Sequence, residues 1–252
     1  MSNKNNRRFL ALDFDGVLVD SIQECLVVGN NAYAAYSGKG AKILSVDELS
    51  HAMLQKARHL RNYIRSGEDY VYIFHALHKK IELKDQIDFD AFLMANTELR
   101  TVFFNLFYLE RQSLLIRERR LWLNLNPIYP GIPMLLYAYA KQDRLAIVST
   151  KKSSYIIEIL QHNGIEVAPK WIFHAHEEYS KRDIISDLLQ QKKLAPCEIH
   201  FIDDQVSNLL AVQPLGVECF LAAWGYNDDK QRQTAARQKL PILTFQEFLQ
   251  NY

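Results

Sequence analysis

The chain has 252 residues, with 30 lysines and arginines against 29 aspartates and glutamates, so its formal net charge is +1. This balance leaves no basic footprint for nucleic acid, and we expect no nucleic-acid partner. Hydrophobic residues make up 48% of the chain and aromatic residues 12%, enough to bury a full core. That composition excludes disorder as a description of the whole, and the length suggests one or two domains.

The number of cysteines and the length of the apolar segments indicate the cellular compartment that we expect for the protein. Three cysteines, with no CxxC pair, argue against a disulfide framework and a thiolate zinc site. No apolar stretch reaches the roughly 18 residues that span a bilayer, and the apolar run near the N-terminus is cut by Asp13 and Asp15. We therefore expect a cytoplasmic protein without a signal peptide or membrane contact. The sequence does not decide between a monomer and a homodimer.

The first predicted element is a strand at residues 9–12, a continuous apolar run that ends in Asp13-Phe14-Asp15-Gly16. From about Ile22 to Asn126, breakers are few and apolar residues recur at helical spacing, which predicts a mostly helical stretch. One helix is expected to include residues 54–64 and to align three arginines on one face: Arg58, Arg61 and Arg65. We interpret this face as solvated, with contact to an anionic leaving group as the alternative.

A break at residues 126–131 is followed by apolar runs that alternate with amphipathic helices. The predicted strands are 145–149, 171–174, 199–202 and 217–221, and the predicted helices are 153–162, 181–191 and 206–213. Repeated parallel crossovers predict a doubly wound parallel sheet of the α/β class, with ligands at the carboxyl ends of its strands. If the first strand joins this sheet, residues 1–21 and 126–252 form the α/β core domain, and residues 22–125 form an inserted helical cap domain.

Polar side chains follow the predicted strands at the points where they end. Asp13 and Asp15 stand at i and i+2, so their carboxylates start on one side of the strand, where a cation such as Mg²⁺ would relieve their repulsion. Asp203-Asp204 adds carboxylates after a second strand. The hydroxyls of Ser149 and Thr150, before a helix start, suit a phosphate. Lys181, at another helix start, adds a positive charge for phosphate and nucleophile.

In this order, these residues resemble the four motifs of the haloacid dehalogenase superfamily. The motif residues are the run Asp13 to Ser21, then Ser149, Lys181 and Asp203-Asp204. Pro130-Gly131-Ile132-Pro133 and Trp224-Gly225-Tyr226 are similar to segments of the phosphoglycolate phosphatase-like branch. The resemblance implies a Rossmann-like sheet domain whose helical cap closes over the leaving group and selects the substrate.

The resemblance also implies a role for each residue. Asp13 would attack phosphorus and form an aspartyl-phosphate, while Asp15 would protonate the leaving oxygen and then activate water. Mg²⁺ would be held by the side chains of Asp13 and Asp204 and by the backbone carbonyl of Asp15, with Asp203 as the alternative ligand to Asp204. Ser149, Thr150 and Lys181 would bind the transferred phosphoryl group, and Asp15 favours phosphoryl chemistry over dehalogenation.

Three positions depart from the family pattern. Asp203 stands where the family often has glycine, and Asn208 stands where it often has a second acid. Lys181 lacks the proline that often follows that lysine, so Lys170 is kept as an alternative. The function expected from the resemblance is a Mg²⁺-dependent phosphatase acting on a small phosphorylated metabolite. The alternatives are a phosphomutase and a catalytically weak binding or regulatory protein of the same superfamily.

Overall fold

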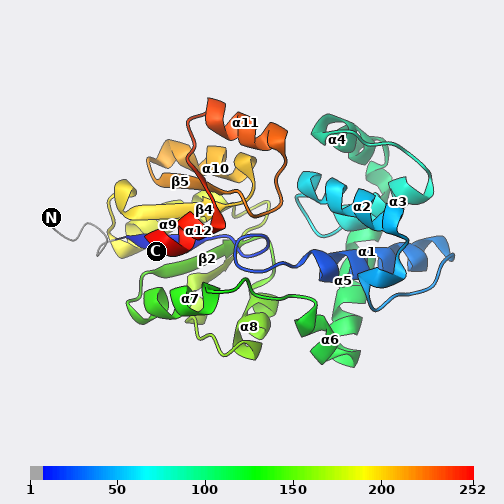
Figure 1. Cartoon of the computed structure of the whole chain (residues 1–252), viewed down its shortest axis with the longest axis horizontal. Coiled ribbons are helices and arrows are strands. Elements are labelled where there is room, and N and C mark those ends of the chain that lie inside the picture. Colours follow the sequence, from blue (N-terminus) through cyan, green and yellow to red (C-terminus); the bar gives the residue numbers. More distant parts are fainter. Residues whose placement is uncertain (1–7) are drawn as a thin grey trace. The chain divides into compact units, whose positions relative to one another are not determined.

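The computed structural model describes residues 8–252, which form two compact units. The first unit contains the chain up to Asp20 together with Ile128–Tyr252, and the second contains Ser21–Pro127 (Figure 1). The expectation that the chain has no signal peptide concerns its N-terminal segment, of which residues 1–7 lie outside the described residues. Within residues 8–252, no helix is both long enough and apolar enough to cross a membrane.

The first unit is built on a six-stranded parallel sheet with the strand order β3-β2-β1-β4-β5-β6. The strands are β1 (Phe9–Leu12), β2 (Leu145–Ser149), β3 (Ile172–His174), β4 (Ile199–Asp203), β5 (Glu218–Ala222) and β6 (Ile242–Leu243). This sheet confirms the predicted doubly wound α/β class. The chain reverses its direction of travel across the sheet between β1 and β4, and open sheets of this kind bind ligands at such a point.

Helices lie on both sides of this sheet (Figure 1). They are α7 (Ile132–Lys141), α8 (Ser153–His162), α9 (Lys181–Lys192), α10 (Val206–Val212), α11 (Asp229–Arg237) and α12 (Phe245–Asn251). Because both faces are covered, the central strands β1, β2 and β4 are buried along their whole length. In one layer of the core, Ala11 and Phe201 pack with Ile184 and Leu209 from the helices α9 and α10. The polar ends of the strands are therefore fixed by a continuous, closely packed core.

The sheet differs from the predicted strands mainly in two places. The strand expected at 171–174 begins at Ile172, because Pro169–Trp171 form a 3₁₀ turn that Pro169 starts. The last strand, β6, was not predicted, since two residues after Pro241 carry too little periodicity to reveal a strand.

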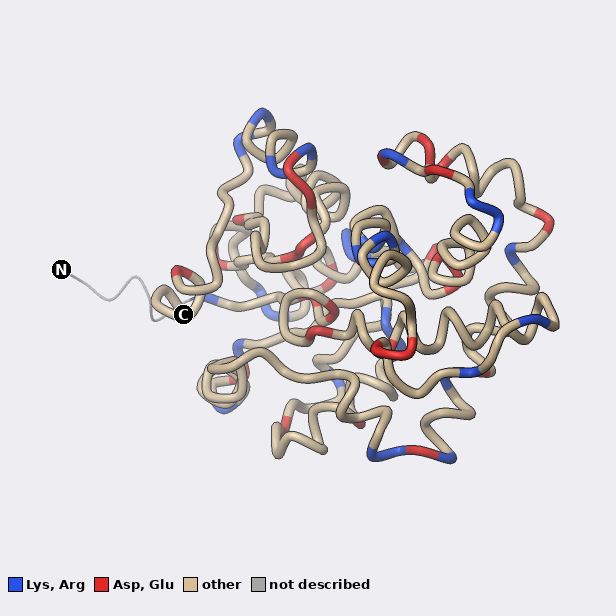
Figure 2. Tube along the Cα trace, turned by 45° about the vertical axis from the view of Figure 1, so that its right-hand side comes forward, with Lys and Arg blue, Asp and Glu red and all other residues tan. Residues whose placement is uncertain are grey.

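The second unit is helical. It contains α1 (Ile22–Ser37), α2 (His51–Leu60), α3 (Asp69–His78), α4 (Gln86–Ala95), α5 (Arg100–Arg117) and α6 (Arg119–Asn124), with 3₁₀ turns at Val46–Glu48, Arg61–Tyr63 and Thr97–Leu99. Side-chain caps set several helix starts: Ser50 accepts from the Met53 N–H and Asp85 from the Asp88 N–H. The helix α1 packs against α3 and α5. Segments of both charge signs lie along each unit, in keeping with the near-neutral sequence (Figure 2).

The expected helix over residues 54–64 was wrong in its extent. The helix α2 ends at Leu60, and the chain tightens into a 3₁₀ turn before Ile64 takes an extended conformation. This change of direction buries Arg61, while Arg58 and Arg65 stay exposed. The three arginines therefore do not form one helical face.

Candidate active site

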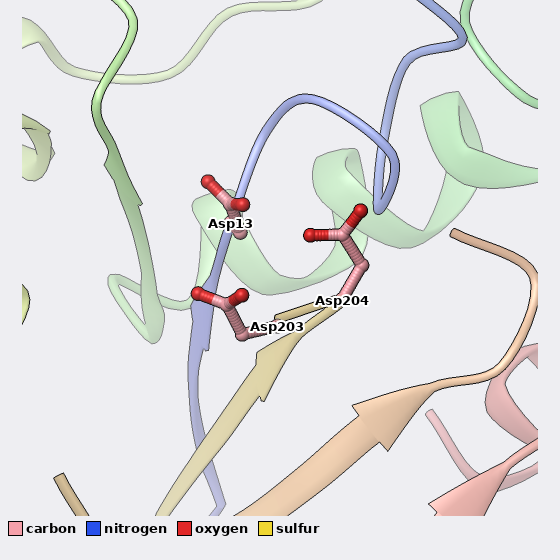
Figure 3. Close-up of side chains that lie close together, drawn as sticks. All are labelled: Asp13, Asp203 and Asp204. Atoms are coloured by element: carbon pink, nitrogen blue, oxygen red, sulfur yellow. The ribbon is translucent and has the colours of Figure 1, made fainter. Parts of the chain in front are cut away.

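Three buried carboxylates meet at the carboxyl ends of β1 and β4 (Figure 3). Asp13 follows β1 directly, Asp203 is the last residue of β4, and Asp204 comes next. The pairing of Leu12 with Ile202 brings the two strand ends together, and the Asp13 N–H donates to the Ile202 carbonyl at 2.9 Å. One oxygen from each carboxylate lies within 4.8 Å of the others. This arrangement is suited to a hard divalent cation.

Lys181 brings a positive charge into this acidic cluster from the first residue of α9. Its Nζ lies 2.9 Å from Asp13 Oδ1 and 2.7 Å from Asp203 Oδ2, and all three side chains are almost fully buried. Burial raises the pKa of Asp13 to about 6 even though Lys181 opposes the shift. The carboxylates of Asp13 and Asp203 outweigh burial at Lys181 and hold its pKa above the usual value. The ammonium group is therefore charged at neutral pH.

The carboxylate of Asp203 is surrounded by hydrogen-bond donors. Its Oδ1 accepts from the Gln205 N–H at 2.8 Å and its Oδ2 accepts from Lys181, while the Asn208 side-chain amide donates to both oxygens at 3.1 Å. Asp203 is fully buried. This environment holds its carboxylate in one orientation and ties it to Lys181 and Asn208.

Asp204 is held differently, between two glycines. Its Oδ2 accepts from the Tyr226 N–H at 2.7 Å. A Cβ on Gly16 would lie 2.3 Å from Asp204 Oδ2, and a Cβ on Gly225 would lie 2.3 Å from Asp204 Cβ. Gly16 also has a φ of +86°, which L side chains rarely adopt. Both glycines are thus needed for the Asp204 carboxylate to occupy this place.

The loop after β1 is anchored by the segment that supplies Gly225. The Trp224 indole N–H donates to the Val17 carbonyl at 3.1 Å, and the Tyr226 hydroxyl donates to Asp20 at 2.7 Å. These two bonds fix the position of the loop that carries Asp15 and Gly16. The Trp224-Gly225-Tyr226 segment, noted in the sequence for its resemblance, therefore has a physical role beside Asp204.

The remaining predicted residues lie at the ends of β1 and β2. Ser149 is buried as the last residue of β2, beside β1, whereas Thr150 is exposed. Asp15 is half-buried, and its Oδ1 lies 2.9 Å from the Nζ of Lys151. The acidic cluster thus unites Asp13, Asp203 and Asp204 with Lys181, while the side chain of Asp15 contacts a different lysine.

Sequence reasoning missed Lys151, which is almost fully buried directly after Ser149 and Thr150. The available signal was its place two residues beyond the end of a buried strand, where side chains turn toward the site. For the other lysine, the structure places Lys181 in the acidic cluster. Lys170 lies in the 3₁₀ turn before β3, with its Nζ 5.0 Å from the centre of the Trp171 ring.

The chain belongs to the haloacid dehalogenase-like hydrolase family, whose model matches residues 10–222, and this confirms the resemblance carried by the motifs. A phosphoglycolate phosphatase of Photobacterium profundum is 26% identical over 227 residues, 87% of this chain and 85% of its own length. A haloacid dehalogenase-like hydrolase of Streptococcus pneumoniae superposes with a TM-score of 0.62 at 15% identity, and a predicted phosphoglycolate phosphatase of Haemophilus somnus with 0.61 at 16%. Both alignments cover 96% of each chain and support the fold.

Proposed function

We propose that this hydrolase is a Mg²⁺-dependent phosphatase that cleaves a small phosphorylated metabolite through an aspartyl-phosphate on Asp13. The observation that carries the proposal is the buried Asp13 carboxylate, which contacts the Lys181 ammonium and shares a cluster with Asp203 and Asp204. An anionic nucleophile and an anionic phosphate repel each other, so this reaction needs positive charge at that place. The name of the Photobacterium relative supports the phosphatase class.

The donor set fits Mg²⁺, which prefers carboxylate and carbonyl oxygens. We assign the ion to the side chains of Asp13 and Asp204 and to the backbone carbonyl of Asp15. When bound, it would neutralise charge between nucleophile and phosphate. Asp203 is assigned to positioning, because both of its oxygens accept hydrogen bonds from Lys181, Asn208 or Gln205.

In the first step, an oxygen of Asp13 forms a bond to phosphorus as the bond from phosphorus to the leaving oxygen breaks. Asp15 gives its proton to that oxygen, and the Lys151 ammonium holds the Asp15 carboxylate in place. Lys181 and Ser149 bind the oxygens of the transferred group. In the second step, Asp15 takes a proton from water, which attacks phosphorus and releases inorganic phosphate and free Asp13.

The test measures phosphate release from a panel of phosphomonoesters that includes phosphoglycolate, with and without Mg²⁺. The native protein is compared with Asp13→Asn and with Asp143→Asn, a control because Asp143 is exposed and lies away from the site. We expect release that requires Mg²⁺, is lost in Asp13→Asn and is unchanged in Asp143→Asn. Acid quenching followed by mass spectrometry should find phosphate on the peptide that contains Asp13.

Other outcomes would contradict this proposal in distinct ways. Phosphate release that survives Asp13→Asn would remove the nucleophile. Transfer to a sugar phosphate, with no release to water, would identify a phosphomutase. Mg²⁺ binding without turnover of any ester would favour the binding or regulatory alternative.

A further inference from the structure

The helix α5, 18 residues long, presents two different apolar faces. One face is buried inside the helical unit and contains Phe103, Phe107, Arg111 and Leu114. It packs against α1 and α3. On the other side, Val102 is 43% exposed, Leu109 61% and Ile116 72%. Because the core of the unit is complete without these three side chains, their exposure calls for another explanation.

The exposed face has the spacing of a coiled-coil seam. Apolar residues recur at alternating intervals of three and four along the helix and its N-cap, with one serine among them. We call this set the α5 seam: Leu99, Val102, Leu106, Leu109, Ser113 and Ile116. Leu99, Leu106 and Ser113 are half-buried, so they form the edge of the exposed stripe. A seven-residue repeat keeps these side chains on one side of the helix, where a second helix can lie along them.

Charge at the two ends of α5 indicates which helix fits. Glu98 stands exposed before the first turn, and the nearby Arg100 lies 3.6 Å from Glu68 of the same unit. At the other end, Arg117 closes the last turn and Arg119 and Arg120 follow it, so these arginines outnumber Glu118; all four side chains are exposed. An antiparallel copy of α5 would bring the acidic end of one helix to the basic end of the other. A parallel copy would bring Arg117 against Arg117 and align the two helix dipoles unfavourably.

The seam is also complementary to itself when its direction is reversed. An antiparallel register places Leu99 beside Ile116, Val102 beside Ser113 and Leu106 beside Leu109, so leucines meet at the two-fold axis. We propose that the α5 seam is a homodimer interface in which a second copy of this chain packs its α5 antiparallel to the first. Specific, stable interfaces bury about 1,200 Å² or more, and the area buried by a single helix pair lies at the low end of this range. The dimer should therefore dissociate on dilution.

The first experiment is sedimentation equilibrium of the full-length protein over a range of concentrations. We expect a reversible monomer–dimer equilibrium that Leu109→Glu shifts to monomer, because this change places two carboxylates at the two-fold axis. The matched control is Met134→Glu on α7, a side chain that is 80% exposed and outside the seam, and it should leave the equilibrium unchanged. Since Leu109 is exposed, thermal unfolding of Leu109→Glu monitored by circular dichroism should match that of the native monomer.

Disulfide trapping then tests the direction of the two helices. In a Cys197→Ser background, which removes the exposed native cysteine, oxidation of Val102→Cys mixed with Ser113→Cys should give a mixed disulfide dimer. Val102→Cys alone should stay monomeric under the same denaturing analysis. A protein that is monomeric at every concentration, a dimer that Leu109→Glu does not affect, or efficient trapping of Val102→Cys with itself would overturn the proposal.

Discussion

Asp203 and Asp204 are neighbours in the chain, yet the groups around their carboxylates differ. Asp203 accepts hydrogen bonds on both oxygens and contacts Lys181, whereas Asp204 lies between two glycines and accepts from the Tyr226 N–H. The sequence predicted both carboxylates at this strand end but left the metal ligand open. That choice depends on residues distant in sequence, such as Tyr226 and Gly225, which motif spacing does not contain.

This difference predicts that the two asparagine variants lose activity for different reasons. Asp204→Asn should weaken Mg²⁺ binding by more than about 100-fold, because it removes the charge of a carboxylate that we propose as a ligand. Asp203→Asn should lower phosphatase activity by about 10–100-fold at saturating Mg²⁺, because Lys181 loses one of its two carboxylate partners. Calorimetric Mg²⁺ titration and Mg²⁺-dependent phosphate release distinguish the two effects. Equal loss of Mg²⁺ affinity in both variants would refute this division.

Between elements, a buried ion pair joins three helices of the helical unit. Arg111 of α5 makes two hydrogen bonds of 2.8 Å to Glu24 of α1, and the Trp122 indole N–H of α6 donates to Glu24 at 3.1 Å. Both charged side chains are at most 5% exposed. Helical spacing predicted helices here, but a charged pair 87 residues apart in sequence leaves no local pattern that could reveal it.

Removing one partner of this pair should leave a buried charge without compensation. Arg111→Met and Glu24→Leu are each expected to lower the free energy of unfolding by about 3–5 kcal/mol, and the double variant by less than either. Urea unfolding followed by far-UV circular dichroism measures these values. As a control, Lys42→Met removes the exposed lysine of the pair with Glu110 and should cost no more than about 1 kcal/mol. Additive losses in the double variant would show that the pair does not act as one unit.

At the scale of the whole molecule, the sequence predicted the buried apolar strands and the breaks between elements best. The strand at residues 145–149 and the helix at 153–162 coincide with β2 and α8, because a fully buried strand and an amphipathic helix have strong periodicities. The turn after Leu60 and the short β6 have no such periodicity. The assignment of residues 22–125 as a cap that selects the substrate stays a prediction, and Ser21–Pro127 form the compact unit at that place in the chain.

The sheet itself carries a titratable group that links stability to pH. His200, the second residue of β4, is 8% exposed, stacks on Phe220 and shares a hydrogen bond with the Tyr252 hydroxyl. Burial, with a smaller contribution from Arg8, lowers the pKa of His200 from 6.5 to about 4. Between these two values, the unfolded chain binds a proton that the folded chain does not bind. The contribution of His200 to stability is therefore complete above pH 6.5 and is lost as the pH falls toward 4.

We expect the free energy of unfolding of His200→Gln, relative to the native protein, to rise by at most about 3 kcal/mol between pH 7 and pH 4. Glutamine does not titrate and can still form a hydrogen bond with the Tyr252 hydroxyl. The comparison therefore isolates the effect of His200 protonation on stability. Urea titrations at several pH values measure this difference. The contributions of buried carboxyl groups such as Asp13 to the pH dependence are the same in both proteins and cancel in the comparison. His162→Gln, the same substitution at an exposed position on α8, is the matched control for a change outside the core. If the difference in the free energy of unfolding between His200→Gln and the native protein stays constant with pH, His200 binds its proton equally well in the folded and unfolded states.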